Sequence, residues 1–220
     1  MLPESYQFFG DEPVVPVIVI HQLDQAVPLA RALVAGGVTS LEVTLRTACG
    51  LDAIRLIAKE VPEATVGAGT VCNAAQFSAV VDAGAQFVVT PGSTDALLNI
   101  AVNSGIPTLP GAVTASEIMR VLDFGFPIIK FFPAATSGGV AAIKAFSGPF
   151  SHARFLPTGG IDPSNARDYL ALPNVVAVGG SWLTPSDAVA SSDWSRITDL
   201  AKASAEFGPE QPKQLRSALV

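Results

Sequence analysis

Charged residues and metal-binding residues are scarce in this sequence. Only 15% of the 220 residues are charged, and the chain has two cysteines and two histidines. Neither Cys49 with Cys72 nor His21 with His152 has the spacing of a metal site. We therefore expect no disulfide framework and no metal site built from these ligands. The lack of disulfides also indicates a reducing, cytoplasmic setting.

Positive charge and long apolar runs are lacking as well. The net charge of −6 and the isoelectric point of about 4.8 argue against nucleic acid or an anionic membrane as a partner. No apolar run reaches the roughly 18 residues that a membrane-spanning helix needs. The chain starts without the basic segment that opens a signal peptide, so we expect no export signal.

Apolar residues, by contrast, are abundant. They make up 49% of the chain, and the mean hydropathy of +0.44 is high for a soluble monomer. The length fits one domain. The sequence therefore predicts either a large core or an apolar surface that another subunit covers.

Short apolar runs alternate with helical patterns along the chain. Strands are expected at 13–20, 39–45, 64–68, 86–90, 106–109, 127–132, 153–157 and 174–178. Helices are expected at 24–35, 49–60, 73–83, 94–103, 114–124, 140–146, 163–170 and 193–206. Four of these helices have a capping signal, at Asp24, Asn73, Thr114 and Asp162.

Eight strand-then-helix units predict a parallel sheet that closes into a (β/α)8 TIM barrel. The alternative is an open doubly wound sheet, which carries a glycine-rich turn after its first strand. Here the first strand is followed by His21, Gln22 and Leu23. We therefore predict one α/β barrel over residues 1–206, with residues 3–9 as an N-terminal cap, and a loosely held tail over 207–220.

A single lysine lies within the sixth expected strand. Alternation puts Ile128, Lys130 and Phe132 on one face of this strand. An amine among such neighbours loses the water that stabilises its charged form. The resulting free amine can attack a ketone and form a Schiff base. The alternative is a lysine that extends past the strand end to solvent.

A carboxylate on the second strand is the matching candidate. Glu42 and Thr44 alternate with apolar neighbours and are predicted to face the barrel interior, and Arg46 follows at the strand's end. A buried Glu42 needs a partner, and Lys130 is the other inward charge on a strand. The pair is either a structural ion pair or a general acid–base residue beside an amine nucleophile.

Glycines cluster where the last two strands end. Thr158, Gly159 and Gly160 follow the seventh strand, and Gly180 with Ser181 follows the eighth. These two loops are the usual phosphate site of such barrels, although both clusters are also consistent with ordinary turns. The glycines of the segment 67–70 are expected to let a substrate approach Thr70. Together, the amine, carboxylate, arginine and anion site suit the cleavage of a phosphorylated keto sugar acid.

Eight motifs, in order from residue 13 to residue 183, resemble the class I 2-keto-3-deoxy-6-phosphogluconate (KDPG) aldolases, also described as 4-hydroxy-2-oxoglutarate (KHG) aldolases. They are PVVPVIVI (13–20), LEVTLRT (41–47), VGAGTV (66–71), AGAQFVVTPG (83–92), KFFPA (130–134), GPF (148–150), RFLPTGGI (154–161) and VGGSWL (178–183). The chain departs from many relatives after KFFPA, where it has Ala135 and Thr136 in place of an acidic residue.

The resemblance implies roles for these residues. Lys130 would form the Schiff base and Glu42 would be the general acid–base residue. The substrate's pyruvate carboxylate would bind Arg46 and Thr70, and its distal phosphate end would bind at the glycine loops. The implied substrate-binding set is Arg46, Thr70, Pro91, Phe132, Thr158, Gly159, Gly160, Gly180 and Ser181.

The resemblance also implies a reaction and an assembly. The products would be pyruvate and glyceraldehyde 3-phosphate, without a metal or organic cofactor, and the chain would form a homotrimer. Three alternatives stay open at this point. They are an aldolase for the galactonate epimer, a phosphosugar isomerase that uses Glu42 as its base, and a non-catalytic phosphosugar-binding barrel.

Overall fold

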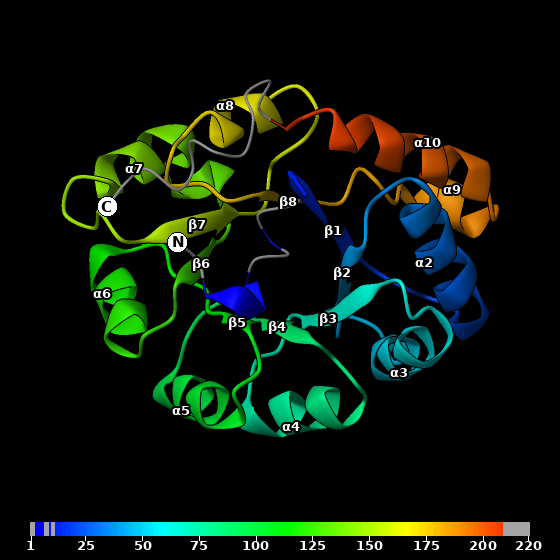
Figure 1. Ribbon diagram of the computed structural model, residues 1–220, viewed down its shortest axis with the longest axis horizontal. Coiled ribbons are helices and arrows are strands. Elements are labelled where there is room, and N and C mark those ends of the chain that lie inside the picture. The colour runs from blue at the N-terminus through cyan, green and yellow to red at the C-terminus, as the bar shows by residue number, and fades with distance from the viewer. Residues whose placement is uncertain (1–2, 7–8, 10–11, 209–220) are drawn as a thin grey trace.

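The computed structural model describes residues 3–6, 9 and 12–208, and among these eight strands alternate with helices around one ring (Figure 1). The strands are β1 (Val14–Ile18), β2 (Ser40–Thr44), β3 (Thr65–Gly69), β4 (Phe87–Val89), β5 (Thr108–Leu109), β6 (Ile128–Phe131), β7 (Arg154–Pro157) and β8 (Val178–Gly180). The α-helices are α2 (Ala26–Ala35), α3 (Gly50–Glu60), α4 (Ala74–Asp82), α5 (Asp95–Ser104), α6 (Ala115–Asp123), α7 (Gly139–Phe146), α8 (Ala166–Leu170), α9 (Ser186–Ala190) and α10 (Trp194–Ala205). Short 3-10 turns are η1 (Glu4–Tyr6), η2 (Leu23–Gln25) and η3 (Ala135–Ser137).

Parallel pairing closes the strands into a barrel. Six strands pair in the order β5-β4-β3-β2-β1-β8, and β6 pairs with β7. Single parallel bridges join the two sheets, from Gly111 to Lys130 on one side and from Thr158 to Gly179 on the other. The strand order is that of a (β/α)8 barrel, so the predicted fold is confirmed.

The side chains form an outer and an inner core. Alternate strand residues such as Leu41, Val43 and Ile129 pack outward against the helices. The inner core is apolar and includes Phe87, Ile128 and the N-terminal Phe9. Ile128 thus lies inside the barrel and Ile129 outside, as the alternation in the sequence predicted.

The N-terminal segment covers the end of the barrel at which the strands begin. The Tyr6 hydroxyl accepts a hydrogen bond from the Thr108 amide at 2.9 Å and donates one to the Thr108 carbonyl at 3.3 Å. Burial raises the pKa of Tyr6, although the hydrogen bond to the Thr108 backbone partly offsets this effect. The ring of Phe9 packs edge-on against Phe87 with centroids 5.0 Å apart. Tyr6 and Phe9 therefore both contact residues of the barrel strands.

Two of the four predicted helix caps are correct. Asn73 accepts a hydrogen bond from the Gln76 amide, and Thr114 forms a capping box with Glu117. The cap predicted at Asp24 is wrong, because η2 occupies residues 23–25 and α2 begins at Ala26.

The last quarter of the barrel differs most from the predictions. Asp162 does not open α8; its carboxylate accepts two hydrogen bonds from Ser164, which closes a turn ahead of the helix. The eighth strand is 178–180 instead of 174–178, and only a single bridge pairs Val175 with Phe155. The helix α9 was not predicted.

Two remaining predictions from the sequence concern membrane-spanning helices and the C-terminal tail. Within the described part of the chain, no helix is both long and apolar enough to cross a membrane. The tail expected at 207–220 lies outside the described residues from position 209 onward. Phe207 packs its ring against Trp182, with centroids 6.3 Å apart.

Candidate active site

Lys130 lies inside the barrel at the bridge that joins β5 to β6. Its amide donates to the Pro110 carbonyl at 3.0 Å, and its carbonyl accepts from the Ala112 amide at 3.0 Å. Only 3% of the residue is exposed. The lysine therefore does not extend to solvent, and its side chain is buried inside the barrel.

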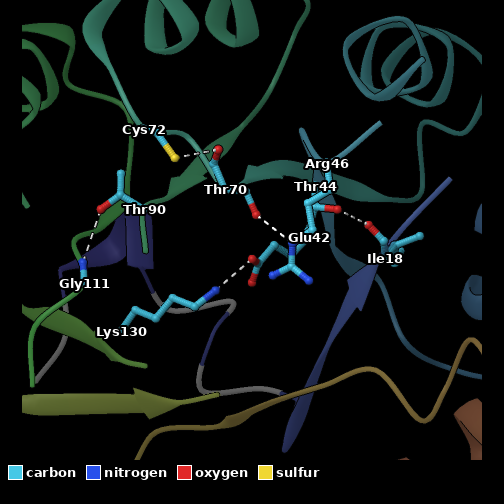
Figure 2. A network of polar contacts seen from close by, with 9 residues as sticks. All are labelled: Ile18, Glu42, Thr44, Arg46, Thr70, Cys72, Thr90, Gly111 and Lys130. Atoms are coloured by element: carbon cyan, nitrogen blue, oxygen red, sulfur yellow. Dashed lines mark hydrogen bonds and ion pairs between the residues drawn. The ribbon is translucent and has the colours of Figure 1, made fainter. Parts of the chain in front are cut away.

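Glu42 points at this amine from the opposite wall (Figure 2). Its Oε1 lies 2.9 Å from the Lys130 Nζ, and the two side chains are 1% and 4% exposed. Glu42 Oε2 is buried and has no hydrogen-bond partner in the structure. The prediction that the two inward charges meet is confirmed. The pair leaves one carboxylate oxygen available for another group.

The ring of Phe132 lies beside the pair. Lys130 Nζ is 5.5 Å from the centroid of this half-buried ring. The cation therefore has an aromatic face near it in addition to the carboxylate. Phe132 ends the run Ile128, Lys130, Phe132 that the sequence assigned to one face of the strand.

Arg46 and Thr70 form a second polar group at the same end of the barrel. Arg46 Nε donates to Thr70 Oγ1 at 3.1 Å (Figure 2). The guanidinium itself is exposed, so its other donors are accessible to an anion. Thr70 has a φ of +60°, a conformation that is strained for a β-branched residue. Such strain at a strand end is typical of functional sites.

Thr90 links the loop that contains Pro91 to Gly111, which follows β5. Its hydroxyl donates to the Gly92 carbonyl at 2.6 Å and accepts from the Gly111 amide at 3.2 Å. Gly111 in turn forms the bridge to Lys130. This role of Thr90 was not predicted from the sequence. A threonine between a buried strand and a Pro-Gly turn was the available signal.

The two glycine loops lie next to each other, as the fold predicts. Thr158 bridges to Gly179, and the Thr158 hydroxyl is buried with no hydrogen-bond partner in the structure. Gly159 and Gly160 have φ values of +98° and +71°, which glycine adopts without strain. Backbone amides in such a loop can face an anion.

The loops after β6 and β8 complete this side of the barrel. The Ala135 amide donates to the Gly159 carbonyl at 3.0 Å, so the segment that departs from the resembled motif packs on the glycine loop. Ser181 is exposed beside the buried Gly180. A Cβ on Gly180 would lie 1.8 Å from the Trp182 ring. Trp182 therefore packs against the turn.

Two glycines of β3 have a different role from the one predicted. They were expected to let a substrate approach the strand. A Cβ at Gly67 would instead lie 2.4 Å from the ring of Phe87, and one at Gly69 would lie 2.2 Å from Glu42 Oε1. Protein side chains already occupy both spaces.

The geometry therefore offers four functions at one end of the barrel. These are a buried amine, a carboxylate in contact with it, an arginine beside a hydroxyl, and two neighbouring glycine-rich loops. Within the described residues, no group of three or more His, Cys, Asp or Glu side chains is placed to hold a metal ion.

Comparison with known proteins gives consistent matches over most of the chain. The family profile described as "KDPG and KHG aldolase" matches residues 7–200. The KHG/KDPG aldolase of Escherichia coli (strain K12) is 59% identical over 194 residues, which are 88% of this chain and 91% of that protein. The 2-dehydro-3-deoxy-phosphogluconate aldolase of Dickeya dadantii is 58% identical over 190 residues, with coverage of 86% and 89%.

A solved structure also matches most of the chain. The KDPG aldolase from Legionella pneumophila, solved with pyruvate captured as a covalent carbinolamine intermediate, is 47% identical and has a TM-score of 0.90. The match covers 92% of this chain and 98% of that one.

Proposed function

The chain belongs to the KDPG and KHG aldolase family, and from this premise we propose that Lys130 and Glu42 carry out the family's Schiff-base reaction. The enzyme is a carbon–carbon lyase. It cleaves 2-dehydro-3-deoxy-6-phosphogluconate into pyruvate and glyceraldehyde 3-phosphate, a step of the Entner–Doudoroff pathway. The observation that carries the residue assignment is the buried contact of 2.9 Å between Lys130 and Glu42.

The first step makes the nucleophile. Transfer of a proton from the Lys130 ammonium to Glu42 across this contact leaves a free amine and a neutral acid. The amine attacks the C2 ketone and gives a carbinolamine. The acid then protonates the departing hydroxyl, which leaves as water and produces an iminium ion on Lys130.

The second step breaks the carbon–carbon bond. Glu42, again a carboxylate, removes the proton of the C4 hydroxyl. The C3–C4 bond breaks, and its electrons move into the iminium to form an enamine while the aldehyde departs. Glu42 returns the proton to C3, and water hydrolyses the pyruvate iminium to free Lys130. The unpartnered Glu42 Oε2 supports this role, because it is free to accept the substrate's proton.

The remaining residues would orient the substrate. We assign the substrate carboxylate to the exposed guanidinium of Arg46, with the Thr70 hydroxyl beside it. Pro91 and Phe132 would line the pyruvate half of the site. The phosphate would bind the loop amides of Gly159, Gly160, Gly180 and Ser181 near the Thr158 hydroxyl.

The same site is proposed to cleave 4-hydroxy-2-oxoglutarate to pyruvate and glyoxylate, because that substrate needs only the pyruvate half. The test compares kcat/KM for this substrate, for the phosphogluconate substrate and for its galactonate epimer. We expect the phosphogluconate substrate to be turned over fastest. Faster cleavage of the galactonate epimer would favour the alternative aldolase.

A lysine variant tests the mechanism itself. Lys130→Ala should abolish cleavage, whereas Lys144→Ala, which removes an exposed lysine on α7, should leave it unchanged. Full turnover by Lys130→Ala would eliminate the Schiff-base mechanism. It would leave a barrel that uses Glu42 as a base, as in a phosphosugar isomerase.

We further propose that the chain forms a homotrimer in the cytoplasm and uses no cofactor. The high mean hydropathy supports an assembly, as do the exposed side chains of Val102 on α5 and Met119 on α6. Light scattering should give three times the chain mass of 22.6 kDa. A mass of one chain would contradict the trimer. Cell fractionation tests the location.

A further inference from the structure

Gly69 occupies a position next to the proposed base. It is the last residue of β3 and pairs in register with Thr44, two residues beyond Glu42 on the neighbouring strand. Both Glu42 and Thr44 are predicted by alternation to face the barrel interior. The Glu42 carboxylate reaches past its own pairing partner, Gly67, to the level of Gly69, and there it meets Lys130.

The space that a side chain would take at Gly69 is filled by this carboxylate. A Cβ on Gly69 would lie 2.2 Å from Glu42 Oε1, 2.7 Å from Cγ and 2.8 Å from Cδ. Oε1 is the oxygen that receives the Lys130 amine. The position of the carboxylate on the amine therefore requires a residue without a Cβ.

The backbone does not require glycine at this position. Gly69 is a regular strand residue and is not among the glycines with positive φ. An alanine would fit the extended backbone, and the three atoms nearest to its methyl group would all belong to Glu42. Because the carboxylate is the free end of a flexible side chain, we expect it to move before the strand does.

From this geometry we infer that Gly69 is a positioning residue for the proton transfers of the aldolase. It acts through Glu42, and the inference therefore rests on the proposed role of that residue. A methyl group at position 69 would displace the carboxylate from the Lys130 amine and from the substrate proton. The lysine would remain in the barrel wall and could still form an imine.

The experiment separates imine formation from proton transfer. Wild type and Gly69→Ala are each incubated with pyruvate. The fraction of Lys130 trapped by borohydride at equilibrium measures the imine, and exchange of the pyruvate methyl protons in D2O, followed by NMR, measures proton transfer. In Gly69→Ala we expect near-normal trapping and exchange slower by about 100-fold or more, the range for loss of a general base.

Gly67→Ala is the matched control. It adds the same methyl group to the same strand two residues earlier, where the clash falls on Phe87 at 2.4 Å instead of on Glu42. Its ratio of exchange to trapping should equal that of wild type. Wild-type exchange in Gly69→Ala, a proportional loss of both readouts, or an equal shift in Gly67→Ala would overturn the inference.

Two further variants remove ambiguity. If Gly69→Ala does not fold, the double variant Gly69→Ala/Glu42→Ala should be as stable as Glu42→Ala alone, because the clashing side chain is gone from both; a double variant less stable than Glu42→Ala contradicts the inference. Glu42→Ala alone tests the assignment on which the inference rests. Wild-type exchange in Glu42→Ala would refute the proposed base, whatever Gly69→Ala does, whereas slow exchange in Glu42→Ala with fast exchange in Gly69→Ala would refute only the role of Gly69.

Discussion

The two ends of the barrel interior are filled in opposite ways. Where the strands begin, Phe9 and Phe87 pack ring to ring and Tyr6 closes the end with hydrogen bonds to Thr108. Where the strands finish, Lys130 and Glu42 form a buried ion pair. The first arrangement pairs the Tyr6 hydroxyl with the Thr108 backbone, whereas the second leaves Glu42 Oε2 without a hydrogen-bond partner among the described residues. The difference indicates that one end stabilises the fold and the other is organised for chemistry.

Two glycines of β3 show the same difference between the ends of the barrel. Gly67 leaves space for the Phe87 ring, and Gly69, two residues later, leaves space for the Glu42 carboxylate. A single strand therefore serves both ends, with a different neighbour at each glycine. Variants at the first end should change stability alone, whereas variants at the second should change catalysis, with or without a change in stability.

The largest expected effect is on catalysis, from Glu42→Gln. This change keeps the size of the side chain but removes the base, so kcat should fall by about 10²–10⁴-fold. The matched control is Glu12→Gln, near the start of the first strand, where the carboxylate accepts from the Thr39 and Ser40 amides at 2.8 and 3.1 Å. It should lower thermal stability and leave kcat unchanged. Equal losses of kcat in both variants would contradict the separation of a stabilising end from a catalytic end of the barrel.

The second prediction concerns the cost of the buried pair. Lys130→Met alone leaves Glu42 unpaired in the interior and should lower the free energy of unfolding by about 3–5 kcal/mol. The double variant Lys130→Met/Glu42→Leu should be at least as stable as wild type and inactive, because no buried charge remains. Denaturant unfolding measures both. A double variant less stable than wild type would mean that the pair contributes net stability to the fold.

The third prediction tests the other end. Tyr6→Phe leaves the Thr108 amide without its acceptor and should cost about 1–3 kcal/mol of stability, with kcat unchanged. Burial raises the pKa of Tyr6, so the neutral phenol favours the folded state. This contribution is present below the ordinary tyrosine pKa and is lost as pH rises through the raised value. At pH values above the ordinary tyrosine pKa, the free energy of unfolding of wild type should therefore approach that of Tyr6→Phe.

The smallest effect is expected outside the barrel interior, at the start of α6. Glu117 accepts hydrogen bonds from the amides of Val113 and Thr114, which hold its pKa below the ordinary value. Glu117→Ala should cost about 0.5–2 kcal/mol, as for loss of a helix cap, without changing kcat. The contribution is present above the ordinary pKa and is lost as pH falls through the lowered one. The gap between the two unfolding curves should therefore close in acid.

Alternation along the strands was sufficient to predict the centre of the site. The two-residue period of a strand puts Lys130 and Glu42 inside the barrel, and strict strand–helix alternation predicts the closed fold. These inferences succeeded because side-chain direction in a strand depends only on the local period. Motif resemblance added the identity of the reaction.

Features that depend on contacts between strands could not be predicted. The sequence pattern predicted an opening for substrate at Gly69, but the Glu42 side chain fills that space. The contact could not be predicted, because the distance between Gly69 and Glu42 depends on how β2 and β3 align. Asp162 had a good capping signal for a helix, yet its side chain closes a turn on Ser164 instead. The local sequence around Gly69 or Asp162 is compatible with several contacts, and the tertiary structure determines which one forms.

The most direct test of the central assignment is borohydride reduction in the presence of pyruvate, followed by mass mapping of the modified peptide. If Lys130 is the nucleophile that its buried contact with Glu42 indicates, the pyruvyl adduct will be on Lys130 and will be absent from Lys130→Ala. An adduct on another lysine, or none in the folded protein, would contradict the account.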